Sequence, residues 1–317
     1  MANSKKRRRR RRSKAPLGLV LLFLFAVTCI TLALELAGLT NLFTLGEDRT
    51  PTPPPTVTEG TVEIHMIDVG QGDSILIKTP EANLLFDAGQ NNEEVEEAIK
   101  SYFAAEGITH LDYLILTHPD ADHIGSADMV VSTYSVGQII MEPYTYSSET
   151  KVYRDLMEAV EEKNVPVKDP DSGEIITVGE LQMTVLGPTQ DFNDKNENSI
   201  VIRIDYGENS ILMTGDAEKK SESALLSTFG TAMLDVDVLK VGHHGSDTST
   251  TDAFLAAVSP EIAIISSNPK GNTFGHPKLD TLNKLSAIGA VIYRTDTLGD
   301  IVLIFDGTNI TFEAQND

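Results

Sequence analysis

Residues 114–125 read Leu-Ile-Leu-Thr-His-Pro-Asp-Ala-Asp-His-Ile-Gly. In this stretch an apolar segment, predicted to be a buried strand, runs into a loop that holds two imidazoles and two carboxylates within six positions. Alternate residues of an extended loop project to the same side, so His118, Asp120 and Asp122 are expected to face one way and His123 the other. Two ions about 3.5–4 Å apart suit in-line hydrolysis. The stretch therefore predicts a site for two metal ions.

The same stretch also fits the beginning of a helix. Pro119 would then be the first helical residue, and Asp120 and Asp122 would complement the partial positive charge at the helix N-terminus. Taken alone, the stretch does not decide between these two interpretations. Two motifs further along the chain favour the metal site.

Each of these motifs places a metal-binding residue type after an apolar strand and a glycine. Residues 211–216 read Ile-Leu-Met-Thr-Gly-Asp, which puts Asp216 at the end of a predicted strand. Residues 238–246 read Val-Leu-Lys-Val-Gly-His-His-Gly-Ser. Glycines let backbone and ligand come close, and adjacent histidines point apart. One of His243 and His244 can therefore bind metal while the other faces substrate. A turn aspartate and a chance histidine pair are the structural alternatives.

The rest of residues 61–317 alternates short apolar runs with amphipathic segments. Strands are expected at residues 61–67, 74–77, 84–86, 113–116, 138–141, 175–178, 181–186, 200–204, 211–213, 236–241, 262–265, 291–293 and 301–304, and helices at 92–105, 126–132, 152–162, 219–228, 251–258 and 279–287. Such a mix predicts one α/β or α+β domain, in which two packed sheets are covered by helices.

Composition limits the chemistry and the partners. Cys29 is the single cysteine, so any transition metal must be held by His, Asp and Glu. The formal net charge is −22, but residues 61–317 carry 15 Lys/Arg against 43 Asp/Glu, a net of −28. Charge of that sign opposes broad nucleic-acid binding by this part of the chain. A phosphate substrate drawn in locally by metal ions remains compatible with it.

The N-terminal residues predict a membrane anchor. Residues 1–14 form a basic tail, and the run from Leu17 to Leu34 has no charged residue. A helix rises about 1.5 Å per residue, so residues 15–39 can span a hydrocarbon core of about 30 Å. The flanking positive charge predicts a cytoplasmic N-terminus and an extracytoplasmic remainder. Cleavage of the apolar run as a signal peptide, followed by secretion, is the rival interpretation.

Two further segments complete the expected organisation. Residues 40–60 are a Pro/Thr-rich linker, which would hold residues 61–317 away from the bilayer. We therefore expect a single-pass protein of the cell membrane, with the bilayer as one partner. Nothing in the sequence indicates a protein partner.

The order and spacing of the motifs resemble the metallo-β-lactamase superfamily, and within it the branch that is named after the C-terminal hydrolase domain of the competence protein ComEC. The matching segments are IDVGQGDS (67–74), FDAG (86–89), THPDADHIG (117–125), NENS (196–199), TGD (214–216), LKVGHHGS (239–246) and FGHP (274–277). Bacterial cell-surface phosphorylcholine esterases look like near relatives. The resemblance implies an αββα sandwich with a two-metal site at one edge of the sheets.

The resemblance also implies a role for each candidate residue. His118 and Asp120 would bind the first ion, Asp122, His123 and His244 the second, and Asp216 would bridge them. Asp87 would orient ligands from behind. His243 and His276 would contact phosphate oxygens or protonate the leaving group, and Asn198 and Ser199 would contact substrate.

Departures from the family pattern weaken the first ion's site. Asp120 stands where the superfamily usually has histidine, and no histidine occurs between His123 and His243, where a further ligand is expected. Asn198 or Ser199 occupies that region. Few, oxygen-rich ligands predict weaker binding and tolerance of Mn²⁺ or Mg²⁺ beside Zn²⁺. The same departures argue against β-lactam hydrolysis.

Three remaining features carry no predicted chemistry. We interpret His65 as a strand residue and His110 as a turn residue. The Gly-Gln-Gly-Asp segment at 70–73 is interpreted as a structural turn.

The function predicted is a phosphodiesterase or nuclease that uses two divalent ions, Zn²⁺ or Mn²⁺, and a hydroxide held between them. Asp122, His243 and His276 would take part in catalysis. DNA and a cell-wall polymer such as a decorated teichoic acid are the two candidate substrates. A degenerate surface module that binds without catalysis is the alternative from another class, because the first ion's site is incomplete.

Overall fold

The computed structural model describes residues 60–143, 146, 149–268 and 274–316. The expected basic tail (1–14), the membrane anchor (15–39) and all of the linker except Gly60 lie outside the described residues. Within those described ranges, no helix is both long enough and apolar enough to cross a membrane.

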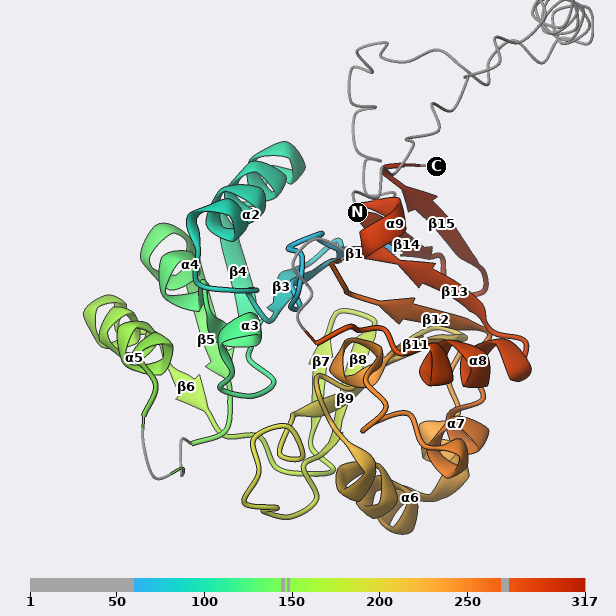
Figure 1. The fold of residues 1–317 in the computed structure, drawn as a ribbon. Coiled ribbons are helices and arrows are strands. Elements are labelled where there is room, and N and C mark those ends of the chain that lie inside the picture. Colours follow the sequence, from blue (N-terminus) through green and yellow to red (C-terminus); the bar gives the residue numbers. More distant parts are fainter. Residues whose placement is uncertain (1–59, 144–145, 147–148, 269–273, 317) are drawn as a thin grey trace, which may run out of the picture. The chain divides into compact units, whose positions relative to one another are not determined.

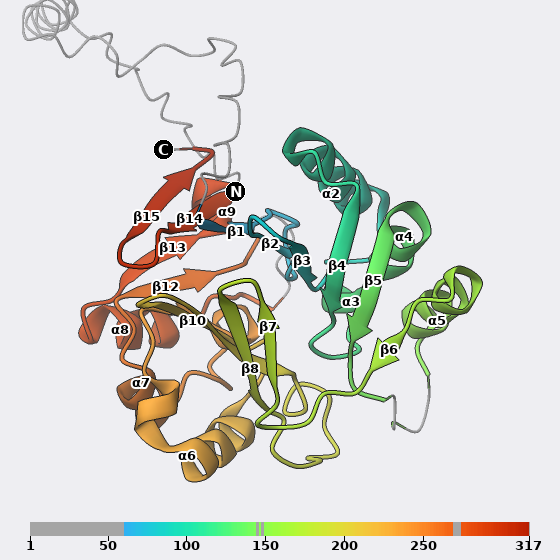
Figure 2. The same ribbon diagram turned by 180° about the vertical axis from the view of Figure 1, so that it is seen from behind.

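Two β-sheets pack face to face (Figures 1 and 2). The first sheet has the strand order β15 (Ile310–Ala314), β14 (Ile301–Phe305), β1 (Val62–Met66), β2 (Ile75–Lys78), β3 (Asn83–Phe86), β4 (His110–Ile115), β5 (Ser135–Ile140) and β6 (Val167–Lys168). The second has the order β13 (Val291–Arg294), β12 (Ile262–Ile265), β11 (Val238–Lys240), β10 (Asn209–Met213), β9 (Val201–Tyr206), β8 (Leu181–Gly187) and β7 (Ile175–Val178).

Helices cover the outer face of each sheet. On the first sheet lie α2 (Glu93–Glu106), α4 (Ala127–Thr133) and α5 (Lys151–Lys163), and on the second lie α6 (Lys219–Leu234), α7 (Asp252–Val258) and α8 (Leu279–Ala287). Central strands such as β3, β10 and β12 are therefore apolar on both faces, as the continuous apolar runs in the sequence indicate. The predicted sandwich of two sheets between two helical layers is confirmed.

The layers meet through three apolar clusters. Ile64 and Phe86 of the first sheet pack against Ile202 of the second in the central cluster. Leu85 packs under the first helical layer, and Leu239 packs under the second. Strands such as β3 and β11 thus contribute alternate residues to two clusters, which fixes their register.

Helix α2 illustrates how local sequence sets an element. The Asn92 side chain accepts a hydrogen bond from the Val95 backbone N–H and caps the first turn, and Gly107 ends the helix in the left-handed conformation. Val95, Ile99 and Phe103 recur every four residues and are buried against the sheet. The helix expected at 92–105 therefore forms almost as predicted.

The parallel strands carry the polar loops to one edge. Strands β3 to β6 run parallel in the first sheet, and β10 to β13 run parallel in the second. The carboxyl ends of β4, β10 and β11 lead directly into the segments that hold His118, Asp216 and His244. Loops at the carboxyl ends of parallel strands are the usual place for a ligand site in such sheets.

Several expectations from the sequence are corrected. His110 is the first residue of β4 and not a turn residue, because it pairs with Ser135 on β5. Helix α6 continues past the expected end at 228, across a non-helical Gly230, to Leu234. The short elements β6, β15, α3 (Ala121–Ile124), α9 (Thr295–Leu298) and the 3₁₀ segment η2 (Gly242–Gly245) were not expected.

His65 is a strand residue, as expected, but it belongs to a buried polar network. Its Nδ1 lies 2.8 Å from the Tyr102 hydroxyl and its Nε2 lies 3.2 Å from Glu63 Oε2. Lys78 Nζ donates to Glu63 and, at 2.6 Å, to Glu106. The network ties β1 and β2 to α2, and the lysine offsets the charge of both carboxylates.

Candidate metal centre

The segment after β4 is a turn into a short helix. His118 is buried, Asp120 occupies the N-cap position of α3 with an extended backbone, and Asp122 lies in the first helical turn. The extended loop predicted for residues 118–122 is therefore wrong. The alternative interpretation, in which a helix begins here, is correct about the helix, but the Asp120 side chain makes no capping hydrogen bond. The two aspartates are thus left to face the site.

Asp216 enters the same space from β10. Gly215, at φ +50°, lets the chain turn where an added Cβ would lie 2.9 Å from the Thr117 Cβ. The Asp216 backbone N–H donates to Ser199 Oγ at 3.1 Å, and its carboxylate is buried. Burial alone would raise the pKa of Asp216, but His123 and His244 hold it well below its usual value. The group is therefore a carboxylate that requires a positive partner.

The paired histidines diverge, as expected from their adjacency. Both histidines of η2 adopt the left-handed conformation, with φ of 50° for His243 and 51° for His244. Non-glycine residues rarely do so, and the strain is of the kind stored at functional sites. His244 is fully buried, whereas the His243 side chain is 22% exposed.

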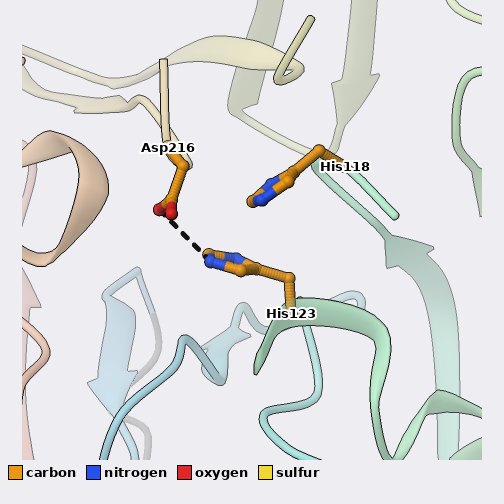
Figure 3. Close-up of side chains that lie close together, drawn as sticks. All are labelled: His118, His123 and Asp216. Carbon is orange, nitrogen blue, oxygen red and sulfur yellow. Dashed lines mark ion pairs between the residues drawn. The ribbon is translucent and has the colours of Figure 1, made fainter. Parts of the chain in front are cut away.

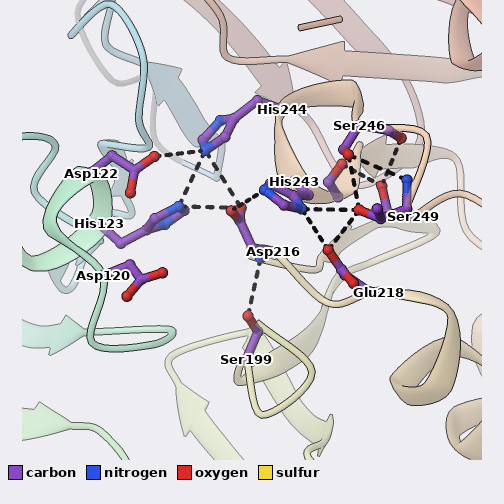
Figure 4. A network of polar contacts seen from close by, with 12 residues as sticks. Asp120, Asp122, His123, Ser199, Asp216, Glu218, His243, His244, Ser246 and Ser249 are labelled. Atoms are coloured by element: carbon purple, nitrogen blue, oxygen red, sulfur yellow. Dashed lines mark hydrogen bonds and ion pairs between the residues drawn. The ribbon is translucent and has the colours of Figure 1, made fainter. Parts of the chain in front are cut away.

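Four side chains converge on one point (Figure 4). His123 Nε2 lies 3.2 Å from Asp216 Oδ1 and 3.2 Å from His244 Nε2. His244 Nε2 lies 3.5 Å from Asp216 Oδ1 and 3.6 Å from Asp122 Oδ2. Ligands about 2.1 Å from a tetrahedral ion are about 3.4 Å apart, so these separations suit a single divalent ion.

The tautomers of the two buried imidazoles also suit a cation. His123 Nδ1 lies 2.7 Å from Asp87 Oδ2, and His244 Nδ1 lies 3.1 Å from the Ser266 carbonyl oxygen. Both acceptors require the proton on Nδ1, so each neutral ring presents the Nε2 lone pair to the site. Burial would lower the pKa of His123, but Asp216 and Asp87 raise it well above its usual value. An ion bound at Nε2 would displace the additional proton that this raised pKa favours, and the proton on Nδ1 would stay.

His118 lies beside His123, and both rings face Asp216 (Figure 3). Its ring centroid is 4.1 Å from that of His123, and its Nδ1 is 3.1 Å from the Thr117 hydroxyl, which donates to Asp87. Within the described residues, its buried Nε2 has no hydrogen-bond partner. His118, His123 and Asp216 offer three ligand atoms close enough to hold an ion. His123 Nε2 already belongs to the four converging side chains, so His118 Nε2 is the ligand atom that this trio adds toward the first of the two ions predicted from the sequence.

Asp120 makes its closest polar contact with a lysine. Lys195 Nζ donates to Asp120 Oδ1 at 2.8 Å, whereas His118 Nε2 is 3.9 Å from Asp120 Oδ2. Figure 4 marks no contact between Asp120 and the other residues drawn. Asn198 lies nearby, and its amide donates to Tyr146 and Asp191. The segment in which the further histidine ligand was expected thus places the Lys195 ammonium group beside Asp120.

His243 is held by an acidic partner. His243 Nδ1 lies 2.9 Å from Glu218 Oε1, and Glu218 also accepts a hydrogen bond from the Thr248 hydroxyl. His243 Nε2 lies 3.6 Å from Asp216 Oδ2. Burial lowers the pKa of His243, but Glu218 and Asp216 raise it overall. His276 stands 5.3 Å from His243 between ring centroids, and burial and His243 lower its pKa to about 4. The two rings thus favour opposite protonation states.

Four polar residues near the centre were not predicted from the sequence. They are Asp73, Lys240, Glu218 and Thr248. Asp73 follows Gly72 after an apolar strand, the pattern that identified Asp216, but the segment was interpreted as a turn. Lys240 is a charged residue inside an otherwise apolar strand, which is a signal for a buried ion pair.

Comparison with known proteins agrees with this geometry. The family model of the metallo-β-lactamase superfamily matches residues 67–267. The chain belongs to this superfamily. ComE operon protein 3 of Bacillus subtilis is 34% identical over 88% of the chain, and competence protein ComA of Neisseria gonorrhoeae is 32% identical over 78%. These relatives place the chain in the ComEC-like branch.

The extent of these matches defines what they show. The ComEC-like chain spans 38% of the length of ComE operon protein 3 and 33% of that of ComA. Among solved structures, the metallo-β-lactamase fold protein YhfI from Bacillus subtilis has a TM-score of 0.52 at 14% identity, covering 77% of this chain and 100% of that one. The structural likeness concerns the fold.

Proposed function

We propose that this chain is a metal-dependent phosphodiester hydrolase. The observation that carries the proposal is the spacing of four ligand atoms on Asp122, His123, Asp216 and His244, with both imidazole lone pairs turned inward. A divalent ion bound there would lower the pKa of a water molecule and offset the charge that develops on a phosphoryl group. His118 Nε2 and the Asp120 carboxylate are the ligand atoms available where the first of the two ions is expected from the sequence.

The chain's own residues supply positioning and proton transfer. Asp87 fixes the ring of His123 through Nδ1, which keeps Nε2 directed at the centre. His243 is partly exposed and has Glu218 at its Nδ1, so a proton on its Nε2 can pass to a departing oxygen. His276 stands beside His243 and can contact the phosphate. Burial of the ligands restricts access of bulk water.

The substrate class rests on chemistry and on the relatives' names. The relatives include competence and recombination proteins, which favours DNA. The net charge of −28 over residues 61–317 opposes a long polyanion and favours a small or cell-surface phosphodiester, such as a choline-phosphate ester. Residues 15–39 would anchor the hydrolase to the membrane, with the domain outside.

The deciding experiment measures metal and turnover together. The purified chain is analysed for bound Mn²⁺ and Zn²⁺, and its hydrolysis of bis-p-nitrophenyl phosphate is followed with each metal. We expect metal-dependent turnover that Asp216→Ala abolishes together with tight metal binding. Fewer than one ion per chain and no turnover would overturn the proposal and favour a non-catalytic binding module.

A second comparison identifies the substrate. Linear DNA and choline-phosphate esters are offered to the same preparations. Cleavage of DNA that persists in Asp122→Ala would show a contaminant and reject the nuclease.

A further inference from the structure

The two halves of the metal centre differ in how complete they are. Around Asp122, the neighbouring ligand atoms are already 3.2–3.6 Å apart, which is the spacing of ligands that share an ion. Around Asp120, the shortest separation from a ligand nitrogen is 3.9 Å, to His118 Nε2. The half around Asp120 therefore lacks the compact geometry of the half around Asp122.

Lys195 fills the incomplete half. It lies on the segment between β8 and β9, 75 positions from Asp120 in sequence, and its Nζ donates to Asp120 Oδ1 at 2.8 Å. Both side chains are only partly exposed, at 29% and 36%. A lysine ammonium is a compact positive charge with three N–H donors, so one can hold Asp120 while the others meet oxygens of a phosphoanion.

We propose that the ammonium group of Lys195 takes the place of the first cation. The chain then binds one divalent ion tightly, through Asp122, His123, Asp216 and His244, and Lys195 supplies the second positive charge beside the substrate. An ion entering beside Asp120 must displace this ammonium and is repelled by it. The role toward substrate rests on the proposed function, whereas the number of tightly bound ions does not.

The first test counts ions without using activity. The full chain and its variants are stripped of metal and titrated with Mn²⁺, and free Mn²⁺ is followed by electron paramagnetic resonance. Lys195→Met removes the ammonium, and Lys195→Arg keeps a positive charge. Lys100→Met on α2 removes a charge that pairs with Glu96 and Glu97 on its own helix. Asp120→Asn removes the partner of Lys195.

We expect Lys195→Met to differ from the other proteins in how many Mn²⁺ ions it binds tightly. The wild type, Lys195→Arg and Lys100→Met bind one ion tightly, and Asp120→Asn keeps that ion. Lys195→Met binds a second ion at least tenfold more tightly than the wild type does. Two ions of similar affinity in the wild type, an unchanged titration in Lys195→Met, or loss of the tight ion in Asp120→Asn would each overturn the inference.

The second test concerns the charge at the substrate. At Mn²⁺ concentrations that fill only the tight site, Lys195→Met should hydrolyse bis-p-nitrophenyl phosphate about 100-fold more slowly, the effect of removing one stabilising group from a transition state. Higher Mn²⁺ should restore most of the rate as the second ion replaces the ammonium. A rate that metal does not restore would overturn this role. Absence of turnover in the wild type with its ion bound would instead overturn the proposed function, while the ion count still decides the place of Lys195.

Discussion

Lys240 Nζ on β11 lies 2.7 Å from Asp73 Oδ2 in the loop between β1 and β2, and both side chains are buried. The pair joins the two sheets directly behind His244, whose Nδ1 is 3.7 Å from Asp73 Oδ1. Burial would raise the pKa of Asp73, but Lys240 and His244 lower it overall, so Asp73 is a carboxylate. The pair therefore supports the metal centre from beneath.

Breaking this pair should destabilise the fold. Lys240→Met leaves the Asp73 carboxylate buried without its cation, and we expect a loss of about 3–5 kcal/mol in the free energy of unfolding. The double variant Asp73→Asn with Lys240→Met should recover much of that loss, because no charge remains unpaired. Urea unfolding in the presence of a chelator measures both. A change below about 1 kcal/mol for Lys240→Met would contradict the assignment.

Gly72 should be required for the position of Asp122. An added Cβ at Gly72, where φ is +134°, would lie 2.3 Å from the Asp122 carbonyl oxygen. Gly107→Ala is the matched control, since Gly107 also has positive φ but open space around it. Gly107→Ala should lose about 1–2 kcal/mol of stability from its left-handed backbone conformation, and Gly72→Ala should lose more, because the added Cβ also overlaps the Asp122 carbonyl oxygen. We expect only Gly72→Ala to weaken Mn²⁺ binding as well, and equal Mn²⁺ affinity in the two variants would refute this.

Glu218 should affect turnover without affecting metal content. Glu218→Gln keeps an acceptor for His243 Nδ1 but removes the negative charge, so the rate should fall about 10–100-fold while bound metal stays constant. Glu208→Gln, in the exposed turn between β9 and β10, is the control for lost charge. Loss of metal in Glu218→Gln would indicate that Glu218 is itself a ligand.

Glu142 should make stability depend on pH. Burial, Asp169 and Asp191 raise its pKa from 4.5 to about 7. The folded state therefore binds more protons than the unfolded state between these values, and stability falls as pH rises through that window. Glu142→Gln should remove this fall and be more stable than the wild type at pH 8 by on the order of 1–2 kcal/mol, since the side chain is only partly buried.

The measurement is the free energy of unfolding at pH 4 and pH 8 in chelator. The two proteins should agree at pH 4, where Glu142 is protonated in both folded and unfolded states. Glu158→Gln on the exposed face of α5 removes a charge at a control position. A gain for Glu142→Gln that is equal at both pH values would contradict the explanation.

The fold was largely accessible from the sequence because both faces of most strands are apolar. Runs such as Ile211–Met213 identify themselves by composition, and α2 by its period and its Asn92 cap. The pairing of β1 with β14, across more than 230 positions, has no local signal. Helix α3 was only the alternative interpretation, because four residues are too few to show a period, and Pro119 and Asp120 fit either conformation.

The centre was accessible only in part, and for a related reason. The histidines and Asp216 follow apolar strands and glycines, a pattern that can be read along the chain. Glu218 and Lys195 reach their partners across 25 and 75 positions from irregular segments, so nothing in their own neighbourhoods distinguishes them from surface charges. Asn198 and Ser199 were the residues expected in place of the missing histidine, whereas the structure brings Lys195, three positions before Asn198, to Asp120.

The position of β1 between β14 and β2 has a consequence for synthesis of the chain. A polypeptide leaving the ribosome makes β1 early but cannot complete its sheet until residues 301–305 have emerged. In the interval, one side of β1 offers unpaired backbone groups to any other strand that approaches. Self-association during expression should therefore be greatest for nascent or truncated chains that end before β14, and it should disappear once that strand is present.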